Sequence, residues 1–322
     1  MSAATLSRLF PDLTATARVL RPALWTHLFP SEQQDACPPV TVALQHVPGL
    51  HQLALAVFPE TDPNQPIRYP VLLFIALFGL AVGIVGFALI PPKLWTWRRA
   101  FLLFAGMNLA GISCHCLAPL NSRQMSFGWA ADVACTGSSS FYLILATLYH
   151  PRPLSWTPEN DAQHTSIPPD QKSLALQAHL LTAILFSFSH IGLSNSHQGF
   201  RIPFTSEIVY LAITALAGAV MTLKLVAPSW TKSETEMGIS SIGFLALNAA
   251  ACSVAISLVL AVPIEQTMCS SRLNTEVSAS ILSVKEVGIL HIFFLGCTLA
   301  FLSLLCYIRI GGYGCERKTK KE

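Results

Sequence analysis

Residues 69–90 read YPVLLFIALFGLAVGIVGFALI, an apolar run without a single Asp, Glu, Lys or Arg. The hydrocarbon core of a bilayer is about 30 Å thick, and a helix needs about 20 apolar residues to cross it. This run therefore has the length and composition of a membrane-spanning helix. Six further stretches of the same character follow at 100–118, 128–149, 174–194, 206–227, 238–262 and 288–310.

The composition of the whole chain agrees with a membrane protein. Of its 322 residues, 52% are hydrophobic and only 11% are charged, and the mean hydropathy is +0.52. Most charges fall between the apolar stretches, because a charge in the middle of a bilayer is costly. We predict an all-α polytopic membrane protein with a seven-transmembrane-helix bundle at 69–310. A lumenal N-terminal segment at 1–68 precedes it and a basic cytosolic tail at 311–322 follows.

Lys and Arg concentrate on one side of the predicted bundle. They lie after the first, third and fifth stretches and at the C-terminal end: Lys93, Arg98, Arg99, Arg152, Lys172, Lys224, Lys232, Arg309, Arg317, Lys318, Lys320 and Lys321. Cytoplasmic loops near spans are enriched in these residues, so we expect a cytosolic C-terminus and a lumenal N-terminus. Lys318 and Lys320 also match the dilysine retrieval pattern of endoplasmic reticulum membrane proteins. A basic tail lying at the membrane surface is the alternative.

Two features of the predicted lumenal segments stay open. The segment 40–58 is apolar but contains two His, a Pro and a Gly, and we predict a helix lying along the membrane interface. An eighth, poorly spanning helix is the alternative. Cys37 and Cys269 both fall on the lumenal side, where oxidation is permitted, so they are candidates for a disulfide. Two free thiols are the simpler alternative.

Six titratable side chains fall at similar depth in the predicted lumenal leaflet. They are His115, Asp132, His190, Glu207, Glu286 and His291. Ionisable groups inside a membrane are costly, so each is a candidate functional residue. Polar residues at span ends also contact headgroups, an explanation that suits Glu207 and Glu286 best. We therefore expect Asp132 and His115 to form the catalytic pair, with Glu207, Glu286 and His291 as secondary candidates.

Two kinds of chemistry fit this set of side chains. A carboxylic acid in a water-poor pocket can stay protonated and act as a general acid, with a neighbouring His to accept or return the proton. Asp132 would be that acid, His115 its partner, and no cofactor would be needed. Alternatively, His115, His190 and His291 would bind a zinc ion that activates water. The sequence leaves both open.

Three of these residues resemble a pattern found in the seven-span hydrolases that include alkaline ceramidases and adiponectin-receptor relatives. Those proteins carry Ser-x-x-x-His at the end of the second span, Asp in the third, and His-x-x-x-His at the start of the seventh. His115, Asp132 and His291 occupy matching positions, whereas Gly111 replaces the serine and Val287 replaces the first histidine of the final pair. The resemblance implies a zinc-dependent hydrolase of ceramide-like lipids that lacks one metal ligand and a supporting hydroxyl.

In its overall architecture the chain also resembles the small polytopic terpene cyclases of fungal meroterpenoid pathways. That resemblance implies a prenylated substrate within the membrane, protonation without a cofactor, and a carbocation stabilised by aromatic rings. Candidate rings near the predicted pocket are Trp129, Phe186, Phe188, Phe204 and Phe293. Because the metal-ligand set is incomplete, a metal-independent terpene cyclase is our leading expectation and the lipid hydrolase the first alternative. A transporter or membrane assembly factor, whose polar cluster conducts protons or fixes helix packing, is the second.

The expected partners are membrane lipids and a hydrophobic small molecule. The chain contains no phosphate-binding loop, no dinucleotide fingerprint and no nucleic-acid signature, so we expect no nucleic-acid partner.

Overall fold

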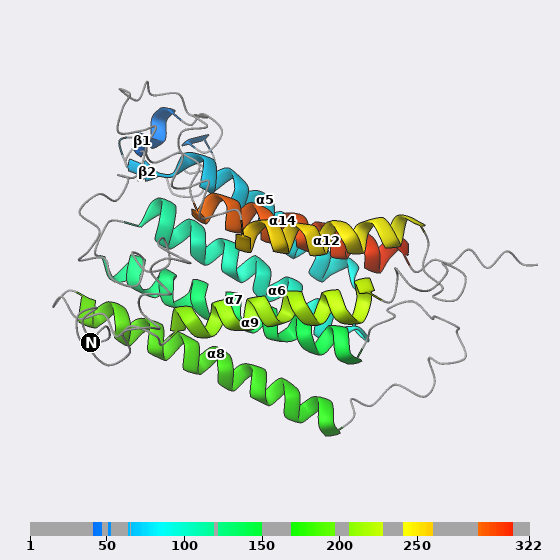
Figure 1. The fold of residues 1–322 in the computed structure, drawn as a ribbon. Helices are drawn as coiled ribbons and strands as arrows, with labels where there is room; N and C mark the ends of the chain where they lie inside the picture. Colours follow the sequence, from blue (N-terminus) through cyan, green and yellow to red (C-terminus); the bar gives the residue numbers. More distant parts are fainter. Residues whose placement is uncertain are drawn as a thin grey trace, which may run out of the picture.

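The computed structural model describes residues 41–46, 51–52, 64, 66–118, 122–149, 169–196, 206–227, 241–259 and 289–311. This part of the chain is mostly helical (Figure 1). Its long helices are α5 (Pro70–Leu89), α6 (Trp95–Gly111), α7 (Arg123–Tyr149), α8 (Pro169–Ser196), α9 (Ser206–Met221), α12 (Ser241–Val259) and α14 (Ile289–Cys306). Three of them continue into π-helical segments, namely η3 (Ile112–Leu117), η5 (Thr222–Val226) and η7 (Tyr307–Gly311).

A helix lies at each of the seven apolar stretches, and successive helices run in opposite directions (Figure 1). Within the described residues, four segments are long and apolar enough to cross a membrane: Pro70–Leu89, Trp95–Leu117, Arg123–Tyr149 and Leu290–Arg309. The other three apolar helices, Ser173–Ser189, Ala212–Val226 and Ser241–Ser257, are shorter. The helical class is therefore confirmed, with four candidate spans.

Large apolar side chains cover the outside of the helices. On α8, Leu176, Leu180, Ile184 and Phe188 recur every four residues and are each about half exposed. Residues four apart share one face of a helix, so they form a continuous apolar stripe along α8. An outer surface of this kind suits lipid rather than water, in agreement with the candidate spans.

Helix α7 lies at the centre of one half of the bundle and packs against α6, α8 and α9. A run of three serines near its middle reaches each neighbour in turn. Ser138 bonds to Thr182 on α8, Ser139 donates to the Ala100 carbonyl oxygen on α6 at 2.9 Å, and Ser140 lies 3.0 Å from Thr214 on α9. Consecutive helical residues point about 100° apart, which is why adjacent serines reach three different helices.

The other half of the bundle is built around α5, which packs against α6 and α14, while α12 packs against α14. Glycines on α5 permit the close approach of α6. A Cβ placed on Gly83 would lie 2.7 Å from the backbone nitrogen of Ala105, so only glycine fits there. This is the small-residue packing expected between helices in a membrane.

Of the segment 40–58, the structure describes residues 41–46 and 51–52, and residues 41–46 do not form the predicted interfacial helix. Thr41–Ala43 forms strand β1, which pairs antiparallel with β2 (Pro66–Arg68), and the short 3₁₀ helix η2 (Leu44–His46) follows β1. Thr41 and Val42 are β-branched and favour extended backbone. Tyr69 then adopts a left-handed conformation (φ 50°) that turns the chain from β2 into α5.

Several sequence predictions fall outside the described residues. These are the disulfide between Cys37 and Cys269, the dilysine signal at Lys318 and Lys320, and the secondary candidate Glu286.

Candidate active site

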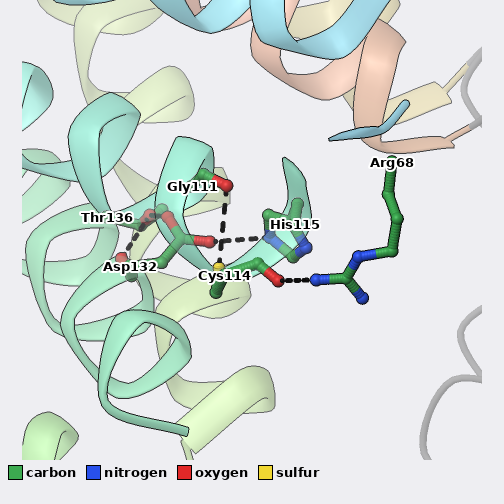
Figure 2. Close-up of polar contacts among 6 residues, drawn as sticks. All are labelled: Arg68, Gly111, Cys114, His115, Asp132 and Thr136. Atoms are coloured by element: carbon green, nitrogen blue, oxygen red, sulfur yellow. Dashed lines mark hydrogen bonds and ion pairs between the residues drawn. The ribbon is translucent and has the colours of Figure 1, made fainter. Parts of the chain in front are cut away.

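The side chains of Asp132 and His115 point toward each other (Figure 2), near the end of the bundle where η3 ends and α7 begins. His115 Nε2 lies 3.2 Å from Asp132 Oδ2, and the two side chains are only 17% and 14% exposed. His115 comes from η3 and Asp132 from α7. The contact predicted between these two residues is therefore present, on consecutive helices and mostly shielded from the surroundings.

The π-helical segment η3 sets the position of His115. The Ala118 N–H donates to the Ser113 carbonyl oxygen at 2.8 Å, the five-residue spacing that defines a π-helix. Short π segments are frequent at functional sites because they change which side chains share a helix face. The segment ends at Ala118, whose backbone is extended, because the next residue is a proline.

A glycine on α7 lets the two backbones approach each other at the site. A Cβ placed on Gly128 would lie 3.1 Å from Cys114 Cβ and 3.2 Å from the Cys114 backbone nitrogen. Gly128 comes one turn before Asp132 on the same face of α7. The close approach at Gly128 thereby brings Asp132 within reach of His115.

Arg68 holds the end of η3 from the other side. Its Nη2 donates to the Cys114 carbonyl oxygen (Figure 2) and to that of Ala118, both at 2.8 Å. Arg68 is only 8% exposed. The last carbonyls of a helix lack intrahelical donors and need other partners when buried. Strand β2 supplies that partner, so the N-terminal segment is tied directly to the segment that carries His115.

Thr136 makes the remaining polar contacts of Asp132. Thr136 Oγ1 donates to the Asp132 carbonyl oxygen at 2.8 Å and lies 3.4 Å from Oδ1. The two carboxylate oxygens thus face different partners, Thr136 at Oδ1 and His115 at Oδ2. Helix α7 begins at Arg123, nine residues before Asp132 and earlier than the predicted start of the span at 128. Asp132 is therefore about 14 Å from the helix start, deeper than predicted.

A third group beside the pair has metal-binding chemistry. Cys114 Sγ, one His115 nitrogen and one Asp132 oxygen all lie within 4.8 Å of one another, and Cys114 is buried. Thiolate, imidazole and carboxylate are the usual ligands of zinc. These three side chains could hold such an ion. The alternative trio of His115, His190 and His291 stays a prediction, because the side chain of His190 lies outside the described residues.

His291 lies on α14 and is 2% exposed. Its ring packs edge-on against Tyr69, with centroids 5.8 Å apart, and His115 packs edge-on against Phe294 at 6.1 Å. Phe294 also contacts Phe293, at 6.2 Å. Aromatic rings from α14 and the turn before α5 thus surround the histidines of this end of the bundle.

For Glu207 and His190, the structure describes only the helix that carries each residue. Glu207 is in the first turn of α9 and His190 near the end of α8, at the same end of the bundle as Asp132 (Figure 1). Their side chains lie outside the described residues. An open depression of about 200 Å³ is lined by Leu109, Ile112, Ser113, Leu117, Ala118 and Gln124, and neither Asp132 nor His115 is among its lining residues.

Sequence reasoning missed three residues of the site. Neither Arg68 nor Cys114 is among the candidates that the sequence indicates. Thr136 carried a usable signal, because it follows Asp132 by four residues and so shares its helix face.

Comparison of the chain with protein-family models, with curated proteins and with solved structures finds no match.

Proposed function

We propose that this chain is an integral-membrane terpene cyclase in which Asp132 protonates a lipophilic isoprenoid. The observation that carries the proposal is the shielded contact of 3.2 Å between His115 Nε2 and Asp132 Oδ2. A buried carboxyl group paired with an imidazole is a recognisable acid–base unit. Its position between membrane-type helices favours a substrate that dissolves in lipid.

The proposed topology has seven spans, a lumenal N-terminus and a cytosolic C-terminus in the endoplasmic reticulum membrane. The alternating direction of the seven helices supports the span count (Figure 1). Lys93, Arg98, Arg99 and Arg309 belong to the end of the bundle opposite Asp132, and this supports a cytosolic assignment of that end. The active site then opens toward the lumenal leaflet.

The geometry supports proton transfer in the following way. Protonated Asp132 gives its proton to an alkene carbon or an epoxide oxygen, and a substrate carbocation forms. His115, when it donates from Nε2 to Asp132 Oδ2, stabilises the carboxylate that remains. After ring closure, the carboxylate or the imidazole removes a proton from the cation. The net reaction is an isomerisation that consumes no cofactor.

Aromatic rings near the pair support stabilisation of the cation. Phe294 lies edge-on to His115 and contacts Phe293, and Phe127 packs against Phe186 at 5.3 Å on the neighbouring helices α7 and α8. A cation over an aromatic face gains about 0.5–2 kcal/mol per contact. Among the rings expected from the sequence, Phe186 and Phe293 are thus in aromatic contacts at this end.

The test is product analysis with purified protein in deuterated water. Prenylated and epoxidised isoprenoids are incubated with the wild-type chain and with Asp132→Asn. We expect cyclised products of unchanged elemental composition, with one solvent deuterium when an alkene is protonated, and a rate about 10²–10⁴-fold lower for the variant. Full activity of Asp132→Asn would remove Asp132 from the mechanism.

A divergent zinc-dependent lipid hydrolase is the second candidate, favoured by the Cys114–His115–Asp132 group within 4.8 Å. Three protein ligands with one open position are typical of catalytic zinc, and the ion would activate water for attack on an amide or ester. Metal analysis separates the candidates. About one zinc per purified chain, lost in His115→Ala, would favour the hydrolase and end the metal-independent proposal.

A further inference from the structure

Arg99 is partly buried against two aromatic rings at the end of the bundle opposite Asp132. Its guanidinium carbon lies 5.1 Å from the Trp95 ring centroid and 5.9 Å from that of Tyr142. Arg99 Nη1 donates to Tyr142 Oη at 3.0 Å and lies 3.1 Å from His179 Nε2. These contacts join α6, α7 and α8, and the described side chains that contact Arg99 are all neutral or basic.

The neighbouring arginines at this end serve a different purpose. Arg98 Nε donates to the Phe87 carbonyl oxygen at 2.8 Å, and Arg309 Nη1 donates to that of Leu89 at 3.2 Å. Both therefore cap the C-terminal end of α5, where positive charge is favoured. Asp132, at the far end, is the only carboxylate whose side chain the structure describes. Within the described residues, Arg99 has no countercharge.

We propose that Arg99 and His179 bind the phosphate of an anionic phospholipid. A guanidinium offers five N–H donors in a fork that matches phosphate oxygens, and the hydrogen bonds of Arg99 to described residues all use Nη1. The stacking on Trp95 and Tyr142 fixes the guanidinium before the ligand arrives, which lowers the entropic cost of binding. Arg99 is in the second turn of α6, near headgroup depth for the proposed topology.

The surroundings favour a lipid over free phosphate. His179 is exposed and lies beside the apolar stripe of α8, three residues after Leu176 and one before Leu180. That stripe continues through Ile184 to Phe188, away from Arg99 and toward the membrane interior. An acyl chain can follow the stripe while the phosphate stays at Arg99. A free phosphate ion would gain nothing from these side chains.

The proposal is independent of the catalytic assignment, because it involves neither Asp132 nor His115. The full-length chain is titrated in detergent with dioctanoyl phosphatidic acid, dioctanoyl phosphatidylcholine and inorganic phosphate, and bound ligand is measured by native mass spectrometry. We expect phosphatidic acid to bind at least about tenfold more tightly than either control. Arg99→Gln should lose this preference. Lys224→Gln removes the same charge from an exposed position at the same end and should retain it.

His179→Ala is the second variant, since an exposed residue can be replaced without loss of folding, and it should weaken phosphatidic acid binding severalfold. Equal binding of the two lipids by the wild-type chain would overturn the proposal. So would an equal loss in Arg99→Gln and Lys224→Gln, which would indicate a diffuse positive potential. Inorganic phosphate binding as tightly as the lipid would overturn the lipid assignment.

Discussion

Arg68 Nη2 donates to the carbonyl oxygen of Cys114 at 2.8 Å, across 46 positions of the chain. Cys114 is the residue immediately before His115, so this bond fixes the backbone that carries the imidazole. A buried arginine is costly unless its donors are used, and here a single nitrogen serves Cys114 and Ala118 together. The strand before α5 is therefore part of the support of the candidate site.

Removal of this support should loosen η3. Arg68→Gln leaves two buried carbonyls with weaker or no donors, and we expect a loss of about 1.5–3 kcal/mol in stability. Thermal unfolding in detergent and amide exchange at 112–118 measure it. Arg68→Lys keeps the charge and should lose less. Unchanged exchange at η3 in Arg68→Gln would show that the bond is not what holds the segment.

Thr136 should act on catalysis through the orientation of Asp132. Thr136→Val removes the donor to the carboxylate and to the Asp132 carbonyl but keeps the shape of the side chain. We expect turnover to fall about tenfold, against a loss of about 10²–10⁴-fold for Asp132→Asn. The comparison uses initial rates of both variants at matched folded fractions. A Thr136→Val enzyme with wild-type turnover would leave Thr136 as a helix-packing residue only.

The helices were predictable because each apolar stretch is long and nearly free of charge. The pairing of Asp132 with His115 was predictable from depth alone, since adjacent antiparallel helices bring residues at one depth together. The predicted contact is therefore confirmed, whereas the catalytic role of the pair stays a prediction.

The parts that could not be predicted depend on backbone geometry and on contacts across long separations. The apolar sequence of η3 gives no sign of a π-helix, because helix type there depends on how the ends are held. Arg68 immediately precedes the first apolar stretch, where a charge needs no buried partner, yet it is buried against carbonyls about 50 residues away. The strand at Thr41–Ala43 likewise requires its partner β2.

Gly128→Ala should move Asp132 on α7 away from His115 on η3. The added methyl group would lie 3.1–3.2 Å from Cys114 Cβ and backbone nitrogen, so α7 and η3 must move apart by a few tenths of an ångström. We expect the turnover rate to fall by a larger factor than the equilibrium constant for folding. Gly218→Ala is the matched control, because there the methyl group meets Val254 Cγ1 at 2.8 Å, in the contact between α9 and α12 that involves neither α7 nor η3. An equal effect of both variants on turnover would contradict the special role of Gly128.

The serine run of α7 should contribute to stability by small, separable amounts. Hydrogen bonds between helices in a membrane average about 0.6 kcal/mol in double-mutant cycles. A cycle with Ser140→Ala and Thr214→Val isolates the bond between α7 and α9. Unfolding in mixed micelles should give a coupling energy of that size, with turnover unchanged because the pair is remote from Asp132. A coupling energy near zero would mean that both hydroxyls find other partners.

Replacement of Cys114 distinguishes the two proposed functions and leaves both Asp132 and His115 in place. Its thiol lies beside His115 and Asp132 but has no role in protonation by Asp132, whereas the zinc-dependent alternative uses it as a ligand. We expect Cys114→Ala to keep turnover within about threefold of wild type, since the replacement is small and apolar at a buried position. The assay pairs turnover with thermal unfolding, because a destabilised variant lowers activity without any change in mechanism. Loss of activity in a stably folded Cys114→Ala protein, together with loss of bound zinc, would contradict acid catalysis and favour metal-assisted hydrolysis at this site.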